Sequence, residues 1–268
     1  MTLWNHRQAT LDRAKTKISA GAVDKITYTT SLDAFRGRNL IVESIVEDLD
    51  SKLAFYQEMT PLADARTLIA TNTSGLSVNK LAEAVTGPDR FLGMHWFNPP
   101  TLIPLIEIIK NHHTRPEVAT AIYDLSLAIG KKPVVLEQDV PGFAANRIQL
   151  AVLREALSLV QKGVVSVEGI DAVMKYGLGF RWACLGPLET IDFGGLGVFE
   201  HISEYLMPDL EDSHEVPPLL AEKVKNGCLG VKSGKGFYDY SGDKAQEATR
   251  ARDAKFQAVY EALYGEPK

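Results

Sequence analysis

A histidine and a glutamate stand twelve residues apart in two apolar segments that predict neighbouring strands. His95 lies near the carboxyl end of Phe91–Phe97 (FLGMHWF), and Glu107 lies in the middle of Leu105–Ile109 (LIEII). A carboxylate inside a buried strand needs a partner, because an unpaired buried charge is costly. An adjacent histidine would supply one, and the carboxylate would fix the imidazole tautomer and make it a stronger base, as the oxidation of a hydroxyl group requires. A buried structural ion pair is the alternative interpretation.

The segments around this pair alternate between strand and helix patterns. Strands are expected at 2–4, 39–45, 67–71, 91–97, 105–109 and 133–136, and helices at 8–20, 77–85 and 116–129. Most of these strands are short, nearly continuous apolar runs, which is typical of strands buried on both faces of a sheet. The alternation predicts a parallel, doubly wound sheet. Ligands of such sheets bind at the carboxyl ends of the strands, where His95 falls.

From Asp139 onward, helical patterns dominate the chain. Helices are expected at 141–163, 167–176, 197–206, 218–226 and 243–263. We therefore place a boundary near Val140, with a nucleotide-binding domain over residues 1–139 and a helical domain for substrate and dimerisation over 140–268. The long apolar helix faces would suit a homodimer interface, although a helical bundle also needs such faces to build its own core.

Composition excludes several classes of function. A net charge of -5 with scattered basic residues offers no surface for nucleic acid or an anionic membrane. Cys184 and Cys228 lack CxxC companions, which argues against a thiolate zinc site and fits a reducing compartment. The pair His112–His113 has no evident third ligand, so no metal site is expected. No apolar run reaches membrane-spanning length, and we expect a cytoplasmic protein.

A doubly wound nucleotide domain normally begins with a strand, a G-x-G-x-x-G turn and a helix that receives the pyrophosphate. Here the glycine-rich stretches lie at 177–179, 194–197 and 234–236, all in the helical half, where turns and helix caps explain them. Residues 2–4 match the end of the second strand of such a domain. A strand–turn–helix unit of roughly 25–30 residues is therefore expected to precede Met1.

Five motifs resemble the successive signatures of 3-hydroxyacyl-CoA dehydrogenases, in the order in which that family has them. They are TNTSGLS (71–77), HWFNPP (95–100), PLIE (104–107), DVPGFAANR (139–147) and KSGKGFY (232–238). The resemblance covers nearly the whole chain. It implies a truncated doubly wound, Rossmann-like parallel sheet followed by an all-helical C-terminal domain. It also implies an NAD(P)-dependent 3-hydroxyacyl-CoA dehydrogenase of fatty acid metabolism.

The resemblance assigns roles to the polar residues around the histidine. His95 would be the catalytic base, oriented by Glu107, while hydride passes between C3 of the substrate and the nicotinamide. Ser74 would hydrogen-bond the reacting oxygen and count among both the catalytic and the substrate-binding residues. Asn98 and Asn146 would complete the polar pocket, with Asn146 also catalytic.

The resemblance also implies the cofactor site. Glu47 and Lys52 match the stretch that borders the nicotinamide ribose and carboxamide, and Asn72 and Asn98 would add further contacts. From the residues alone, the Glu47–Lys52 stretch is a solvated first helical turn.

Asn5 stands where the family usually has an aspartate that grips the adenosine ribose. Asparagine at this position lacks the negative charge that would repel the 2′-phosphate of NADP. Arg7, two residues further on, adds a positive charge that could pair with that phosphate. NAD is the expected cofactor, and NADP stays open beside it.

The sequence motifs do not agree on one class of substrate. Asn98-Pro-Pro, YGLGFRWA (176–183) and GPLE (186–189) look closer to the branch that contains gulonate dehydrogenase and lambda-crystallin. In that branch Arg181 would bind a free substrate carboxylate through two parallel hydrogen bonds. The alternative interpretation is that Arg181 is a surface arginine without a role in binding. A CoA thioester is our first expectation and a free hydroxylated carboxylic acid the second. A non-catalytic structural relative is the third, as the crystallins of this fold illustrate.

Overall fold

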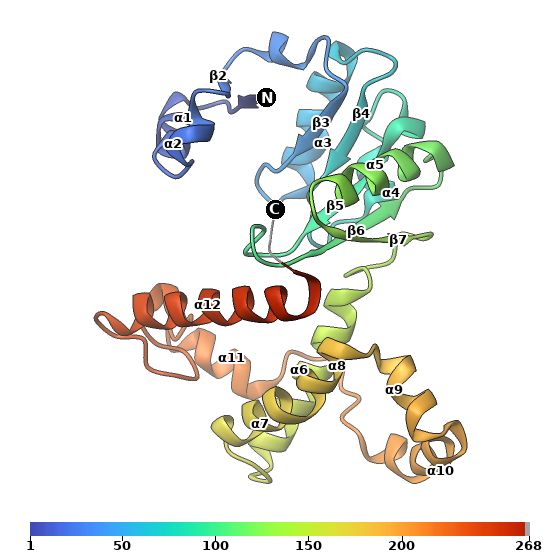
Figure 1. Cartoon of the computed structure of the whole chain (residues 1–268), viewed down its shortest axis with the longest axis vertical. Coiled ribbons are helices and arrows are strands. Elements are labelled where there is room, and N and C mark those ends of the chain that lie inside the picture. The colour runs from blue at the N-terminus through green and yellow to red at the C-terminus, as the bar shows by residue number, and fades with distance from the viewer. Residues whose placement is uncertain (266–268) are drawn as a thin grey trace. The chain divides into compact units, whose positions relative to one another are not determined.

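The computed structural model describes residues 1–265, and the chain divides into two units between Ala144 and Ala145. The first unit contains two sheets. A small parallel sheet pairs β1 (Thr2–Trp4) with β2 (Thr27–Thr29), and α1 (Gln8–Lys15) and α2 (Ala20–Val23) lie between them in sequence. The larger sheet has five strands in sequence order: β3 (Leu40–Glu43), β4 (Leu68–Thr71), β5 (Phe91–Trp96), β6 (Leu105–Lys110) and β7 (Lys132–Leu136) (Figure 1).

Strand direction changes once in the larger sheet. Strands β3, β4 and β5 are parallel, β6 runs antiparallel to β5, and β7 is parallel to β6. The expected all-parallel order therefore fails at one step. Residues 97–104 join β5 to β6 without a helix. A parallel neighbour needs a crossover of about a dozen residues or more, so this short connection returns the chain antiparallel.

Helices cover both faces of the larger sheet. On one face, α3 (Leu49–Met59) and α4 (Val78–Ala82) pack on a cluster that includes Ile69 and Phe91. On the other face, α5 (Pro116–Ala128) packs on a cluster that includes the next residues along the same strands, Ala70 and Leu92. Apolar side chains on both faces explain why these strands read as continuous apolar runs.

Close packing on the α4 face requires a glycine in β5. A Cβ at Gly93 would lie 3.0 Å from the Ile109 side chain and 3.1 Å from Val78. The missing side chain lets α4 and β6 approach β5 two residues before His95, so the position of the histidine is set by a tightly packed strand.

The second unit is helical. Its elements are α6 (Ala145–Gln161), α7 (Val167–Val173), a π-helical turn (Met174–Leu178), α8 (Gly179–Cys184), α9 (Pro187–Gly194), α10 (Leu196–Leu206), α11 (Pro218–Lys225) and α12 (Lys244–Tyr264). Helix α6 begins four residues after the expected start at Pro141, because Gly142 and Phe143 adopt positive φ values of 77° and 56° and turn the chain. None of the helices in residues 1–265 has the length and apolar content that a membrane crossing requires.

Candidate active site

His95 and Glu107 form a buried pair across β5 and β6. The antiparallel register places the two residues opposite each other. His95 Nδ1 lies 2.9 Å from Glu107 Oε2, and the residues are 3% and 1% exposed. The second oxygen of Glu107 accepts a hydrogen bond from the Ala144 backbone N–H at 3.0 Å. Glu107 is therefore held at both oxygens, and it fixes the ring orientation of His95.

Two aromatic rings pack beside the imidazole. The centroid of Phe97 lies 4.4 Å from that of His95, and the centroid of Phe143 lies 5.5 Å away in an edge-on orientation. Phe143 is fully buried although its φ of 56° is unusual for a residue with a side chain. Burial of the ring compensates that backbone strain. Sequence reasoning missed Phe143, because nothing in the DVPGFAANR motif indicates which residue turns inward.

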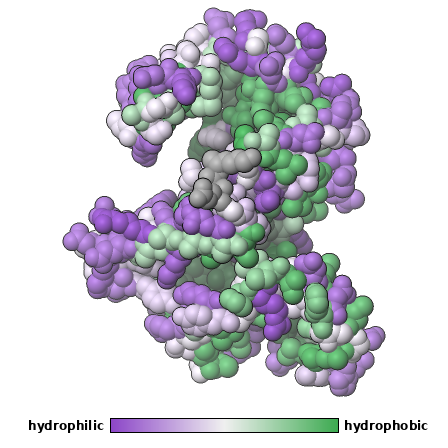
Figure 2. Space-filling model, in the orientation of Figure 1, coloured by the Kyte–Doolittle hydropathy of each residue, from purple (hydrophilic) through white to green (hydrophobic). Residues whose placement is uncertain are grey.

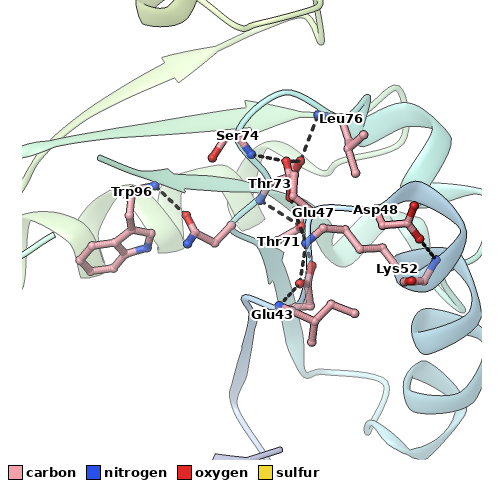
Figure 3. Close-up of polar contacts among 12 residues, drawn as sticks. Glu43, Glu47, Asp48, Lys52, Thr71, Thr73, Ser74, Leu76 and Trp96 are labelled. Carbon is pink, nitrogen blue, oxygen red and sulfur yellow. Dashed lines mark hydrogen bonds and ion pairs between the residues drawn. The ribbon is translucent and has the colours of Figure 1, made fainter. Parts of the chain in front are cut away.

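The turn after β4 carries Ser74. Because β3, β4 and β5 are parallel, their carboxyl ends lie at one edge of the sheet, and Ser74 follows the end of β4 by three residues. Glu47 Oε1 accepts hydrogen bonds from the Thr73 hydroxyl at 2.5 Å and the Ser74 backbone N–H at 2.7 Å. Thr73 in turn accepts from the Leu76 N–H at 3.0 Å (Figure 3). The carboxylate of Glu47 thus shapes the turn that presents Ser74.

Glu47 stays ionised in this position. Partial burial pushes the pKa of its carboxyl upward, but the Thr73 hydroxyl, the Ser74 amide and the Lys52 ammonium outweigh that effect and lower the pKa below its usual value. A carboxylate with part of its surface open to solvent at the carboxyl edge can accept further hydrogen bonds from a ligand hydroxyl.

A cavity of about 450 Å³ opens at the same edge. Its lining combines apolar and amide side chains from the ends of three strands: Val42, Ser44, Asn72, Trp96, Phe97, Asn98 and Pro100. Asn72 accepts a hydrogen bond from the Trp96 backbone N–H at 2.9 Å, which ties β4 to β5. Apolar walls with the amides of Asn72 and Asn98 fit the nicotinamide and ribose half of a dinucleotide.

Lys52 is not at the surface of this site. Its side chain is completely buried, with Nζ 2.6 Å from Glu43 Oε1 and 3.4 Å from Glu47 Oε2. The predicted cofactor contact of Lys52 would therefore act through Glu47. Sequence reasoning also missed Glu43. The argument applied to Glu107 could have found it, since Glu43 is a carboxylate inside an apolar strand pattern.

The remaining predicted residues occupy separate positions. Asn5 directly follows β1, and its side-chain oxygen accepts a hydrogen bond from the Arg7 backbone N–H at 2.9 Å. Asn98 is exposed just beyond β5. Asn146 and Arg181 belong to the second unit, in α6 and α8, and Arg181 is exposed. His112 and His113 are exposed after β6, and residues 1–265 contain no cluster of three metal-ligating side chains.

Known proteins resemble the chain over nearly its whole length. It is 36% identical over 261 residues to 5-formyl-3-hydroxy-2-methylpyridine 4-carboxylate 5-dehydrogenase from Mesorhizobium japonicum. This alignment covers 96% of this chain and 84% of the relative. It is also 36% identical over 239 residues to the 3-hydroxybutyryl-CoA dehydrogenase of Bradyrhizobium diazoefficiens, covering 89% of this chain and 79% of that one.

Two solved structures of related enzymes superpose on nearly the whole chain. The crystal structure of a 5-formyl-3-hydroxy-2-methylpyridine 4-carboxylic acid 5-dehydrogenase, an NAD⁺-dependent dismutase, superposes with a TM-score of 0.92 at 32% identity, covering 99% of this chain and 91% of that one. A 3-hydroxyacyl-CoA dehydrogenase from Archaeoglobus fulgidus reaches 0.72 at 33% identity with the same coverage of both chains.

Two family models match in succession. The NAD-binding domain of 3-hydroxyacyl-CoA dehydrogenase matches residues 3–140, and the C-terminal domain of the same enzymes matches residues 142–240. The two matches fall on the sheet-containing and helical units. Together with the relatives, they show that the chain belongs to the 3-hydroxyacyl-CoA dehydrogenase family of NAD-dependent oxidoreductases.

Proposed function

We propose that this protein oxidises a substrate hydroxyl group, or reduces the corresponding carbonyl group, with His95 as the base that takes and returns the hydroxyl proton. The observation that carries the proposal is the buried His95–Glu107 pair near the carboxyl end of β5, and the residues that follow His95, 96–98, line the cavity. With the Nδ1–H of His95 donating a hydrogen bond to Glu107, Nε2 carries the lone pair that takes the substrate proton. Bound NAD supplies the hydride acceptor for this chemistry.

The neighbouring polar side chains would orient the substrate. Ser74, held by the Glu47-bound turn, would donate a hydrogen bond to the reacting oxygen. Asn98 and Asn146 would complete the polar contacts. Glu47, Asn72 and Asn98 would hold the nicotinamide ribose and carboxamide, and the Phe97 and Phe143 rings would keep bulk water from the imidazole.

The substrate we favour is a small hydroxylated or carbonyl compound with a free carboxylate. The extent of similarity supports this choice, since the match to the pyridine-carboxylate dehydrogenase spans 96% of the chain and its structure superposes with a TM-score of 0.92. That relative is named for a substrate with a free carboxylate. Arg181 would bind such a carboxylate through its guanidinium fork.

A 3-hydroxyacyl-CoA thioester is the second candidate. Relatives named as 3-hydroxybutyryl-CoA dehydrogenases, from Bacillus subtilis and Bradyrhizobium diazoefficiens among others, share 35–36% identity with 85–89% of the chain. These relatives support C3 of the acyl group as the reacting carbon.

A substrate panel distinguishes the two candidates. The chain is assayed for NADH formation with free hydroxy acids and for NADH consumption with acetoacetyl-CoA. Turnover of a free acid that falls in the Arg181→Gln variant, chiefly through a higher KM, is the expected result. Turnover of the thioester alone, unchanged in that variant, would replace the first candidate by the second. A chain that binds NADH but turns over neither class would contradict the proposed reaction.

We further propose that the helical unit forms a homodimer. Large apolar side chains are exposed on α8, α9 and α10, among them Phe180, Leu188, Phe193 and Leu196. Figure 2 shows part of this surface in green over α9 and α10. Exposed apolar surface of this extent is typical of an interface. Light scattering should give the mass of a dimer, and a monomer mass would end the proposal.

A further inference from the structure

A second buried ion pair lies beside the proposed active site. Glu43 is 3% exposed and Lys52 is completely buried. Glu43 Oε1 accepts from Lys52 Nζ at 2.6 Å and from the Ile45 backbone N–H at 2.6 Å. Glu43 Oε2 accepts from the Tyr56 hydroxyl at 2.5 Å and the Thr71 hydroxyl at 2.7 Å. Four donors thus fix the carboxylate at the carboxyl end of β3.

Lys52 connects this buried carboxylate to a second one. Its ammonium group lies between Glu43 and Glu47, at 2.6 Å and 3.4 Å (Figure 3). Glu47 then binds the Thr73 hydroxyl and the Ser74 N–H. A continuous series of contacts therefore runs from the interior of the sheet to the turn that presents Ser74.

We propose that Glu43 is a positioning residue for the reacting site, acting through Lys52 and Glu47 on the Thr73–Ser74 turn. The inference rests on the proposed function only in its last step, the contact of Ser74 with the reacting oxygen.

The charges explain why the inner carboxylate matters. A buried ammonium group needs a carboxylate partner, because an unpaired buried charge is costly. With Glu43 in place, Lys52 makes its short contact inward and leaves Glu47 free to bind the turn. Without the Glu43 charge, Lys52 would pair with Glu47 alone and draw its carboxylate away from Thr73 and Ser74.

The first test needs neither cofactor nor substrate. Exchange of the Ser74 amide proton is followed by NMR in the whole chain, because that amide is bound to Glu47. We expect Glu43→Gln to speed the exchange by roughly tenfold, since a freed donor exchanges from a larger open population. Tyr56→Phe is the matched control. It removes another contact of the same carboxylate but keeps Lys52 paired, so exchange should stay within about twofold. Unchanged exchange in Glu43→Gln would overturn the proposal.

A double variant separates an effect on the Thr73–Ser74 turn from an effect on the stability of the fold. Glu43→Gln/Lys52→Met removes both buried charges, so it should fold even if the single variant does not. Because no ammonium group remains to draw Glu47 away from the turn, we expect the slow exchange of the Ser74 amide to return in this variant together with the melting temperature. Fast exchange that persists after the melting temperature has recovered would show that Lys52 does not transmit the effect, and would overturn the proposal.

Kinetics test the last step. Glu43→Gln should lower kcat by roughly tenfold and change KM less than about threefold, because a displaced Ser74 weakens a contact to the reacting oxygen. In a Glu47→Gln background the same substitution should change kcat by less than about twofold, since its route of action is already broken. Additive losses would overturn the proposed route. A chain without turnover would contradict the proposed function, while the exchange measurement would still decide the role of Glu43.

Discussion

Glu107 meets His95 across a strand pair and, with its other oxygen, binds the backbone of Ala144. The antiparallel register of β5 and β6 brings residues 95 and 107 directly opposite each other. A helical crossover would have separated them. One carboxylate therefore fixes both the imidazole and the last residue of the first unit.

Glu107→Gln tests the role of that carboxylate. The amide keeps an oxygen for the Ala144 N–H, so the fold should be retained. It loses the negative charge that stabilises a protonated imidazole, and it can donate instead of accept toward His95. We expect kcat to fall by roughly 10²–10⁴-fold with little change in melting temperature. Steady-state kinetics and a thermal melt check this, and activity within about threefold of the wild type would contradict it.

Asn5 tests the choice of cofactor. Its side-chain oxygen accepts from the Arg7 N–H, and an aspartate can make the same bond, so Asn5→Asp should keep the local turn. The added charge would repel a 2′-phosphate. We expect NADPH binding to weaken by roughly tenfold while NADH binding holds or tightens. Fluorescence titration with both cofactors measures this, and an equal change for the two would show that Asn5 does not face the adenosine ribose.

Glu47 should make stability depend on pH. Its pKa is lower in the folded chain than the usual 4.5, so it stabilises the fold above that value. The contribution is lost as pH falls through the lower folded value. The difference in unfolding free energy between wild type and Glu47→Gln should therefore be largest near neutral pH and shrink in acid. Urea unfolding at a series of pH values measures it, and a difference independent of pH would exclude an ionised Glu47.

Much of the fold could be predicted from the sequence. Buried strands such as β4 and β5 read as apolar runs, and α5 was expected over 116–129 and spans Pro116–Ala128. The direction of β6 was not predicted, because alternating patterns do not reveal that residues 97–104 lack a helix. The start of α6 was placed too early, because the positive φ of Phe143 has no sequence signature.

The site was predictable where a buried charge forces a partner. Glu107 in its apolar strand pointed to His95, and the structure brings the two together. Lys52 was expected beside the cofactor, yet it is buried against Glu43, since a helix pattern does not show how far a long side chain turns inward. The roles of Asn146 and Arg181 remain predictions, and the substrate panel tests that of Arg181.

The most direct test of the central claim is hydride transfer by His95→Asn, measured as NADH formation beside the wild-type chain. Asparagine keeps a polar group near Glu107 but cannot take a proton. We predict a loss of turnover of roughly 10²–10⁴-fold with NADH binding retained. Turnover equal to that of the wild type would contradict the assignment of His95 as the base.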